Sequence, residues 1–266
     1  MKTYFPLKSF WLTLIPALGL ASVMVAQTET LTSASAANYR PIVAPNSIVT
    51  AWGTSLASTT AAANVTDPGP NAGLPTSLGN VRLAVTGSSQ IAVPATLYLV
   101  SPGQINYVLP ATAALGADTV AVFSNGTTLH GPVLVSNISP AIFTVDGSGA
   151  GMPAGQVLRV NAEGQSTANS LTSTTNTDIS PGNSPGDQVY LVLYGTGFRN
   201  HSLNPVIATA GGIAVPVPYA GAQNEFPGLD QINLGPLPPT LAGIGTVNLT
   251  MAVDGVPANT VQITFR

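Results

Sequence analysis

The stretch Gln104-Ile105-Asn106-Tyr107-Val108-Leu109-Pro110 decides the fold, because a close copy returns at 231–234 as Gln-Ile-Asn-Leu, ahead of a proline-rich turn. The residues after each copy match as well: 114–120 reads Ala-Leu-Gly-Ala-Asp-Thr-Val, and 241–247 reads Leu-Ala-Gly-Ile-Gly-Thr-Val. Both matches keep the same spacing along the chain. Such self-similarity indicates a duplicated structural unit.

Each copy stands among short segments that have the patterns of β-strands. Val81, Leu83 and Val85 alternate with other residues at the period of a strand that has one buried face. Each half ends in two apolar runs, joined by Asn125-Gly126 or by Asp254-Gly255, and both dipeptides accept the positive φ angles of a type I′ hairpin turn. No segment of the mature chain keeps a capped helical period, so we expect an all-β protein with little helix.

A second pair of matching segments predicts a shared corner. Trp52-Gly53-Thr54-Ser55-Leu56 follows one apolar run, and Tyr194-Gly195-Thr196-Gly197-Phe198 follows the other. An aromatic residue, Gly-Thr and then an apolar residue describe a strand that bends sharply and buries a large side chain. We expect Leu56 and Phe198 to be those buried side chains.

The duplication predicts two tandem β-sandwich domains of about 100 residues each. A Ser-, Thr- and Asn-rich tract with one short hairpin separates the two copies. We therefore expect a signal peptide (1–26), a flexible leader (27–44), a first sandwich (45–138), a linker with a short hairpin (139–186) and a second sandwich (187–266).

The first residues have the layout of a secretory signal peptide. Lys2 and Lys8 precede an apolar run at 10–20, which Pro16 interrupts near its middle. The alternative is a membrane anchor, but a span needs about 20 apolar residues, so we expect no stable membrane span after cleavage. We expect cleavage after Ala26, with Ala36 as the alternative.

Charge and cysteine content exclude several classes of function. Lys2 and Lys8 are the only lysines, so the mature chain has five arginines against ten acidic residues. Such a surface repels a phosphate backbone, and we expect no nucleic-acid partner. Cysteine is absent, which rules out disulfides, thiolate nucleophiles and thiolate metal sites.

The residues that catalysis would need are few and scattered. The only histidines are His130, in an expected β-hairpin, and His201, in an expected loop, and serine is too frequent in this chain to mark a nucleophile, so a hydrolase triad is disfavoured. The ten acidic residues are spread along the chain, which disfavours a paired-carboxylate glycosidase. We assign no catalytic residue and expect that the chain is not an enzyme.

Two further patterns are weak signals for bound phosphate or metal. The glycine-rich segment 147–151 lacks the helix and the lysine of a phosphate-binding loop, so we interpret it as a flexible turn. Asp146 and Asp67 could each help to bind calcium, but neither belongs to a run of alternating acids. We assign no cofactor-binding residue, no metal-binding residue and no cofactor.

The repeated amide pairs allow two interpretations. Gln104 with Asn106, and Gln231 with Asn233, each place two amides on one face of a strand, where they could bind a sugar or a peptide. They could instead satisfy backbone groups where strands part, and their repetition favours this structural role. The same choice, between a glycan-stacking surface and core packing, applies to four aromatic residues, for which we favour packing: Tyr98, Tyr107, Tyr219 and Phe226.

The chain resembles a family of uncharacterised C-terminal domains of exported bacterial proteins, of the Solibacter type. The residues that carry the resemblance are Pro102-Gly103-Gln104-Ile105-Asn106, the segment 139–144 (Ser-Pro-Ala-Ile-Phe-Thr), the Tyr194 corner, and 253–261. Each half is also distantly similar to an IPT/TIG immunoglobulin-like domain. The resemblance implies an exported protein built of two immunoglobulin-like sandwiches, and it implies no catalytic residues.

Together these patterns predict a non-catalytic binding or adhesion module, secreted or in the bacterial cell envelope, whose partner is an unknown protein or glycan. One alternative is a polysaccharide-active enzyme, which two or more acids in one cleft would favour. Another is a structural subunit that assembles by β-strand addition, which an apolar, unpaired edge strand would favour. A flat aromatic strip would favour glycan binding.

Overall fold

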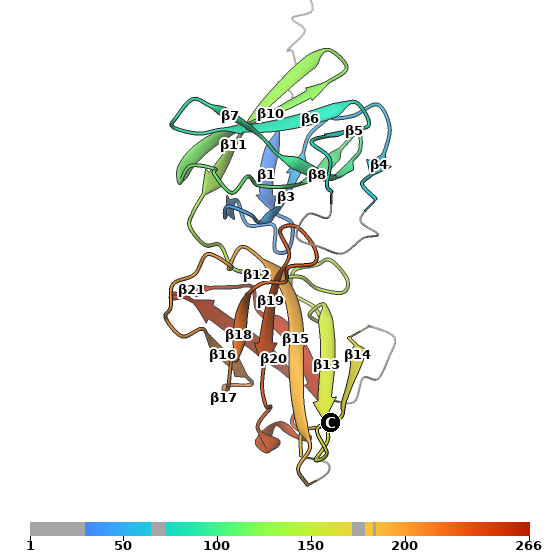
Figure 1. The fold of residues 1–266 in the computed structure, drawn as a ribbon, viewed down its shortest axis with the longest axis vertical. Helices are drawn as coiled ribbons and strands as arrows, with labels where there is room; N and C mark the ends of the chain where they lie inside the picture. Colours follow the sequence, from blue (N-terminus) through green and yellow to red (C-terminus); the bar gives the residue numbers. More distant parts are fainter. Residues whose placement is uncertain (1–29, 65–72, 172–178, 183–184) are drawn as a thin grey trace, which may run out of the picture.

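The computed structural model describes residues 30–64, 73–171, 179–182 and 185–266. Within these residues the protein is all-β, and the single helical element is a short 3₁₀ turn, η1 (Pro239–Leu241). The chain forms two halves that lie end to end along the long axis of the molecule (Figure 1). This confirms the predicted fold class.

The first half consists of two sheets. The strand order in one sheet is β1 (Thr32–Ser35), β3 (Ile48–Trp52), β9 (Gln104–Val108), β8 (Thr96–Val100), β4 (Ala61–Ala62). The order in the other is β2 (Ile42–Val43), β11 (Thr127–Val135), β10 (Gly116–Ser124), β6 (Val81–Thr86), β5 (Ser77–Leu78), with β7 (Ala92–Pro94) also paired to β6. All pairings are antiparallel except that of β2 with β11, which is parallel.

The second half repeats this arrangement. One sheet has the order β14 (Ser166–Ser170), β13 (Gly155–Val160), β15 (Gln188–Thr196), β19 (Asp230–Leu234), β18 (Tyr219–Ala222), with β12 (Ala141–Ile142) also paired to β15. The other has the order β17 (Ile213–Val215), β16 (Ile207–Ala210), β20 (Gly245–Val253), β21 (Val256–Pro257), with β22 (Val261–Phe265) also paired to β20.

The strand order identifies each half as an immunoglobulin-like sandwich. In that fold one sheet has the order A-B-E-D and the other contains G, F and C. Strands β1-β3-β9-β8 and β13-β15-β19-β18 follow A-B-E-D, while β11-β10-β6 and β22-β20-β16 follow G-F-C. The two copies of the Gln-Ile-Asn stretch therefore lie on equivalent E strands, β9 and β19.

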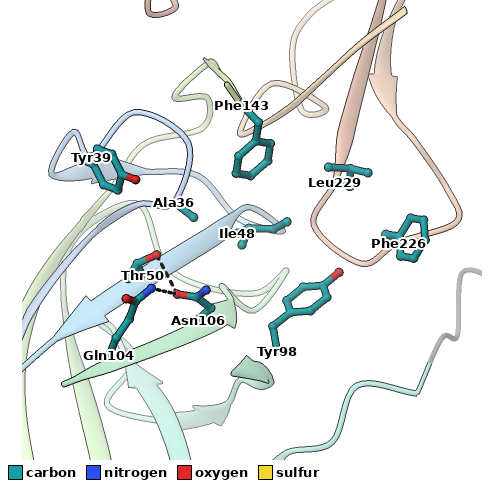
Figure 2. A pocket seen from close by; sticks show the side chains of 10 residues that line it. All are labelled: Ala36, Tyr39, Ile48, Thr50, Tyr98, Gln104, Asn106, Phe143, Phe226 and Leu229. Atoms are coloured by element: carbon teal, nitrogen blue, oxygen red, sulfur yellow. Dashed lines mark hydrogen bonds between the residues drawn. The ribbon is translucent and has the colours of Figure 1, made fainter. Parts of the chain in front are cut away.

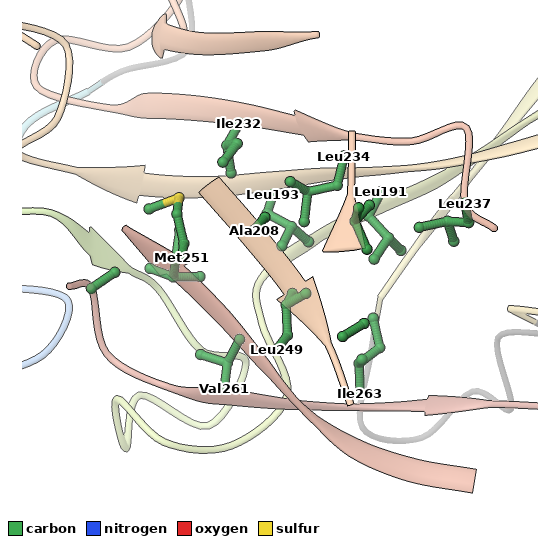
Figure 3. Close-up of a cluster of buried hydrophobic side chains, with 14 of the residues drawn as sticks. Leu191, Leu193, Ala208, Ile232, Leu234, Leu237, Leu249, Met251, Val261 and Ile263 are labelled. Atoms are coloured by element: carbon green, nitrogen blue, oxygen red, sulfur yellow. The ribbon is translucent and has the colours of Figure 1, made fainter. Parts of the chain in front are cut away.

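The cores of the two halves follow from the alternation in the sequence. Val81, Leu83 and Val85 are at most 2% exposed, while the residues between them point outward. In the second half, Ile232 and Leu234 pack against Leu191 and Leu193 of the neighbouring strand (Figure 3). Each large apolar side chain buried in this way contributes about 1.5–3 kcal/mol.

Both predicted hairpin turns are confirmed. Asn125 and Gly126 have φ angles of 50° and 79°, and Asp254 and Gly255 have 46° and 77°. Two consecutive positive φ angles are the mark of a type I′ turn, whose twist matches that of the strands it joins.

The predicted corner is confirmed in both halves. Leu56 and Phe198 are fully buried. A Cβ atom on Gly195 would lie 2.6 Å from the Phe198 ring and 2.3 Å from the Ala141 carbonyl oxygen, so only glycine fits beneath the ring. Gly53 has the same relation to Leu56, at 2.9 Å.

The segment expected as a flexible leader contains two strands. Within its described part, β1 pairs with β3 and β2 pairs with β11, and Ser33, Ala34 and Ser35 are buried. Small side chains such as these can be buried without producing an apolar pattern in the sequence. The expected signal peptide and its first cleavage site lie outside the described residues.

The segment expected as a linker, 139–186, contains the predicted hairpin as β13 and β14. Strand β13 pairs along its length with β14 on one side and with β15 on the other. The hairpin therefore belongs to a sheet of the second half and is not part of a linker. Strand β14 is exposed throughout, which explains why it lacks an apolar signal. We therefore propose a domain boundary near Ser139.

Candidate binding cleft

A cleft of about 450 Å³ lies at the junction of the two halves (Figure 2). The first half contributes the outward side chains of β3, β8 and β9 and the loop after β1. The second half contributes the segment after β12 and the loop before β19. The lining residues are Ala36, Tyr39, Ile48, Thr50, Tyr98, Gln104, Asn106, Phe143, Phe226 and Leu229.

The polar part of the cleft is the first amide pair. The Oδ1 atom of Asn106 accepts hydrogen bonds from Thr50 Oγ1 at 3.0 Å and from Gln104 Nε2 at 2.8 Å (Figure 2). These bonds fix both side chains. Within the described part of the chain, the Asn106 amide nitrogen and the Gln104 amide oxygen have no hydrogen-bond partner, so one donor and one acceptor are available to a ligand.

Four aromatic side chains form much of the remaining wall: Tyr39, Tyr98, Phe143 and Phe226. The hydroxyl of Tyr98 donates to the Pro227 carbonyl at 2.6 Å, which ties the ring to the loop of the second half. Burial raises the pKa of Tyr98 to about 12, against the opposing effect of Arg199, so this hydroxyl is uncharged at neutral pH. The lining includes no Asp, Glu, Lys, Arg or His side chain, and the cleft therefore suits an uncharged ligand.

Hydrogen bonds across the junction fix the two halves relative to each other and so fix the shape of the cleft. The backbone N–H of Ile48 donates to Thr196 Oγ1 at 2.8 Å, and that hydroxyl donates to the Gly228 carbonyl at 2.8 Å. Asn200 Nδ2 donates to the Pro45 carbonyl at 3.1 Å, and Arg40 donates to the Pro257 carbonyl at 3.0 Å. A site fixed in this way loses little conformational entropy when a ligand binds.

A buried carboxylate anchors the loop that supplies Phe226 and Leu229. Asp230 is fully buried and accepts from the backbone N–H of Phe198 at 2.8 Å and from Arg199 Nε at 2.6 Å. Arg199 also donates to the Leu229 carbonyl at 2.7 Å. Burial raises the pKa of the Asp230 carboxyl, and the Arg199 charge opposes that rise.

The sequence did not reveal this role of Asp230. At the equivalent corner of the first half, the backbone N–H of Leu56 donates to the Pro102 carbonyl at 3.0 Å. A backbone carbonyl therefore takes the place that the Asp230 carboxylate has in the second half. The one available signal was the acidic residue directly before Gln231, where the first copy has Gly103.

The structure divides the sequence-predicted binding candidates into two groups. Gln104, Asn106, Tyr98 and Phe226 meet in the cleft. Tyr107 is fully buried, where its hydroxyl donates to Ser33 at 3.3 Å and burial raises its pKa. Its predicted role in packing is confirmed.

The remaining candidates, Tyr219, Gln231 and Asn233, lie on the outer face of the β15-β19-β18 sheet. Sequence reasoning missed Tyr39 and Phe143, because their proximity depends on how the halves dock, and it missed Thr50, whose position beside Asn106 depends on the register of β3 with β9.

The two histidines considered for catalysis do not belong to a Ser-His-Asp triad. The Ser202 hydroxyl donates directly to Asp254 at 2.5 Å, and His201 Nε2 lies 3.0 Å from the Ala220 carbonyl oxygen. A nucleophile and its base must be hydrogen-bonded to each other, and no hydrogen bond joins Ser202 to the His201 ring. His130 lies in β11 and has no acidic partner among the described residues.

The glycine-rich segment 147–151, which we interpreted as a flexible turn, is hydrogen-bonded to other parts of the chain. Asn259 Nδ2 donates to the Gly149 carbonyl at 2.8 Å, and the Tyr39 hydroxyl donates to the Gly147 carbonyl at 2.5 Å. The Asp146 carboxylate accepts hydrogen bonds from the backbone N–H and the hydroxyl of Ser148.

Residues 30–64, 73–171, 179–182 and 185–266 contain no group of three or more His, Asp or Glu residues that could hold a metal ion. Asp67 lies outside the described residues.

Comparison with known proteins leaves the family open. No family model and no curated protein matches this chain. Among solved structures, the I9-I11 tandem of titin has a TM-score of 0.23 and 8% identity, over 85% of this chain and 62% of that one. The extracellular region of plexin A4 has a TM-score of 0.25 and 12% identity, over 95% of this chain and 20% of that one.

This chain therefore spans less than two thirds of either structure, and similarities of this size carry no argument about function. The strand order alone establishes the immunoglobulin-like fold. No helix in the described residues is long and apolar enough to cross a membrane.

Proposed function

We propose that this chain is an exported, non-catalytic binding module, and that the cleft between its two sandwiches binds an uncharged saccharide. The observation that carries the proposal is the combination within one cleft of four aromatic rings and an amide pair that offers one donor and one acceptor.

Sugar chemistry matches this wall. One face of a pyranose ring consists of C–H groups, which pack on aromatic rings, while its hydroxyl groups both donate and accept hydrogen bonds. The Asn106 nitrogen can donate to one hydroxyl, and the Gln104 oxygen can accept from its neighbour. The volume of about 450 Å³ is within the range of small-molecule sites.

Export rests on the sequence. The signal peptide predicted at 1–26 supports secretion or location in the cell envelope, and the resemblance of the sequence to a family of exported bacterial proteins implies the same. We propose this location as the one in which a polysaccharide or glycoprotein would meet the cleft.

The two alternatives have less support. The cleft contains no acidic side chain, whereas a glycosidase needs two. The edge strand β14 has the sequence Ser-Thr-Ala-Asn-Ser, which lacks the large apolar residues that would favour assembly by strand addition, and the apolar edge strand β17 has only three residues.

The test is a screen of the protein without its signal peptide on an array of neutral glycans, followed by calorimetry with each ligand found. We expect Asn106→Ala and Phe226→Ala each to weaken binding about 5- to 10-fold, because each removes one ligand contact. The matched control is Asn248→Ala, an exposed asparagine in the far sheet, which should bind like the wild type. Unchanged affinity in both cleft variants would contradict the proposal.

A further inference from the structure

The second amide pair lies on the face of the second half that is equivalent to the cleft wall of the first. Gln231 Nε2 donates to Asn233 Oδ1 at 2.8 Å, the same bond and the same length as between Gln104 and Asn106. Ile232 points into the core, so both amides point outward. The duplication has therefore kept a polar pair in two different surroundings.

Three tyrosines surround this second pair on the same face. Tyr194 lies opposite Gln231 in the strand register, and Tyr219 lies opposite Asn233. Tyr190 lies on β15 two residues before Val192, which is the other register partner of Asn233. Side chains of paired residues point to the same side of an antiparallel sheet. We call these five residues the tyrosine face.

Two of the rings lie against glycines. A Cβ atom on Gly235 would be 2.8 Å from Cδ1 of Tyr190, and one on Gly221 would be 3.0 Å from the Tyr219 hydroxyl. The absence of a side chain at each glycine lets the tyrosine lie close to the backbone there. Hydrogen bonds from Tyr190 to Gln188 at 2.6 Å and from Tyr219 to the Ala222 carbonyl at 2.5 Å hold the rings in place.

Strand geometry sets the spacing of the backbone positions that carry these rings. Tyr190 and Tyr194 are four residues apart on β15, which corresponds to about 13 Å. Tyr219 lies two strands away from them, at about 10 Å across the sheet. A ligand that contacts all three rings must therefore be longer than one sugar ring.

The tyrosine face meets the cleft at Tyr194. The backbone N–H of Phe143 donates to the Tyr194 carbonyl at 3.0 Å, and the Phe143 side chain lines the cleft. Glu225 is the charged group that acts on this end of the face: it adds to the effect of burial, and together they raise the pKa of Tyr194. The five residues of the face are three tyrosines and two amides, with no Asp, Glu, Lys or Arg among them.

From this continuity we propose that the tyrosine face extends the cleft, and that together they bind a single neutral polysaccharide chain. This inference rests on the proposed function of the cleft. A polysaccharide fits because it repeats apolar ring faces and hydroxyl groups along its length, as the tyrosines and amides do. A peptide chain or a second copy of this protein offers no such repeat.

The experiment is calorimetry with three neutral ladders, of β-1,4-linked glucose, mannose and xylose, from the disaccharide to the octasaccharide. For a ladder that binds, we expect the octasaccharide to bind at least about tenfold more tightly than the disaccharide, because extra rings gain stacking contacts. In the double variant Tyr190→Ala/Tyr219→Ala this gain should vanish, while disaccharide affinity stays at the wild-type value.

The double variant Tyr190→Phe/Tyr219→Phe is the matched control, since it keeps the rings and should keep the gain with length. If the alanine variant fails to fold, the phenylalanine variant is compared with Asn233→Ala instead. We then expect the gain in affinity with oligosaccharide length to be smaller in Asn233→Ala than in the phenylalanine variant. Wild-type affinity that does not depend on length, with disaccharide binding intact, would refute the extension alone.

The proposed function can fail separately. If a long ladder binds with an affinity that Asn106→Ala leaves unchanged but the tyrosine-to-alanine variant abolishes, the tyrosine face binds by itself and the cleft does not. If no ladder binds at any length, the extension is refuted for neutral β-1,4-linked chains.

Discussion

The backbone N–H of Ile48 donates a hydrogen bond of 2.8 Å to the hydroxyl of Thr196, and this contact joins the B strands of the two sandwiches. Thr196 is fully buried, and its hydroxyl also donates to the Gly228 carbonyl. One side chain therefore links the first half, the corner of the second half and the loop that closes the cleft.

Thr196→Val should destabilise the junction. The substitution keeps the shape of the side chain but leaves the Ile48 N–H and the Gly228 carbonyl without their partner, which costs about 1–3 kcal/mol. Urea unfolding measures the change. Thr209→Val, which removes an exposed hydroxyl paired with Thr250, is the control and should change stability by less than about 0.5 kcal/mol. Equal effects of the two variants would show that the junction contact has no special role.

Asp230→Asn should change how stability depends on pH. Burial raises the carboxyl pKa in the folded state, so the folded protein binds a proton at Asp230 more tightly than the unfolded chain does, and this contribution to stability is lost as pH rises through the raised pKa. Asparagine does not titrate. We therefore expect the stability of the wild type relative to the variant to fall between acidic and neutral pH, as measured by melting temperatures across that range. A relative stability that rises with pH would contradict this assignment.

Gly195→Ala should destabilise the second sandwich. The added Cβ atom would lie 2.3 Å from the Ala141 carbonyl oxygen and 2.6 Å from the Phe198 ring, and overpacking of this kind costs about 1–3 kcal/mol. Gly103→Ala is the control, because its nearest neighbour would be 3.9 Å away. Thermal melting measures the stability of both variants. If Gly195→Ala and Gly103→Ala both melt at the wild-type temperature, the close fit beneath the Phe198 ring is not required.

If the protein is exported, the signal peptidase should cut before Leu31. Strand β1 pairs with β3 over its whole length, and Leu31 is 3% exposed, so cleavage after Ala36 would remove a structural strand. We expect mass spectrometry of the secreted protein to give an N-terminus upstream of Leu31, consistent with the predicted site after Ala26. An N-terminus at Ala37 would mean that β1 is dispensable.

The sequence predicts those parts of the fold that have strong local signals. Alternation at Val81 to Val85 and the Asn-Gly and Asp-Gly turns identify strands and hairpins, since a buried face and a positive φ each restrict residue type. Strand β1 escaped because it buries small Ser and Ala side chains, while β14, which is exposed throughout, was predicted only as the second strand of a hairpin.

The candidate site was only partly predictable. Gln104 and Asn106 stand out because they are repeated, and the buried Ile105 between them follows from strand periodicity. Tyr39 and Phe143 come from loops more than 100 residues apart, and only the docking of the two halves brings them together. The Asn106 amide oxygen accepts hydrogen bonds from Gln104 and Thr50, so these side chains bond to one another rather than to backbone groups where strands part.

The most direct test of the cleft is a nuclear magnetic resonance titration of the isotope-labelled protein with the neutral disaccharide that binds best. We predict that the side-chain amide signals of Asn106 and Gln104 shift in a saturable manner, while that of Asn248 stays in place. Saturable shifts elsewhere in the protein, with the Asn106 and Gln104 signals unmoved, would contradict a binding site between the two sandwiches.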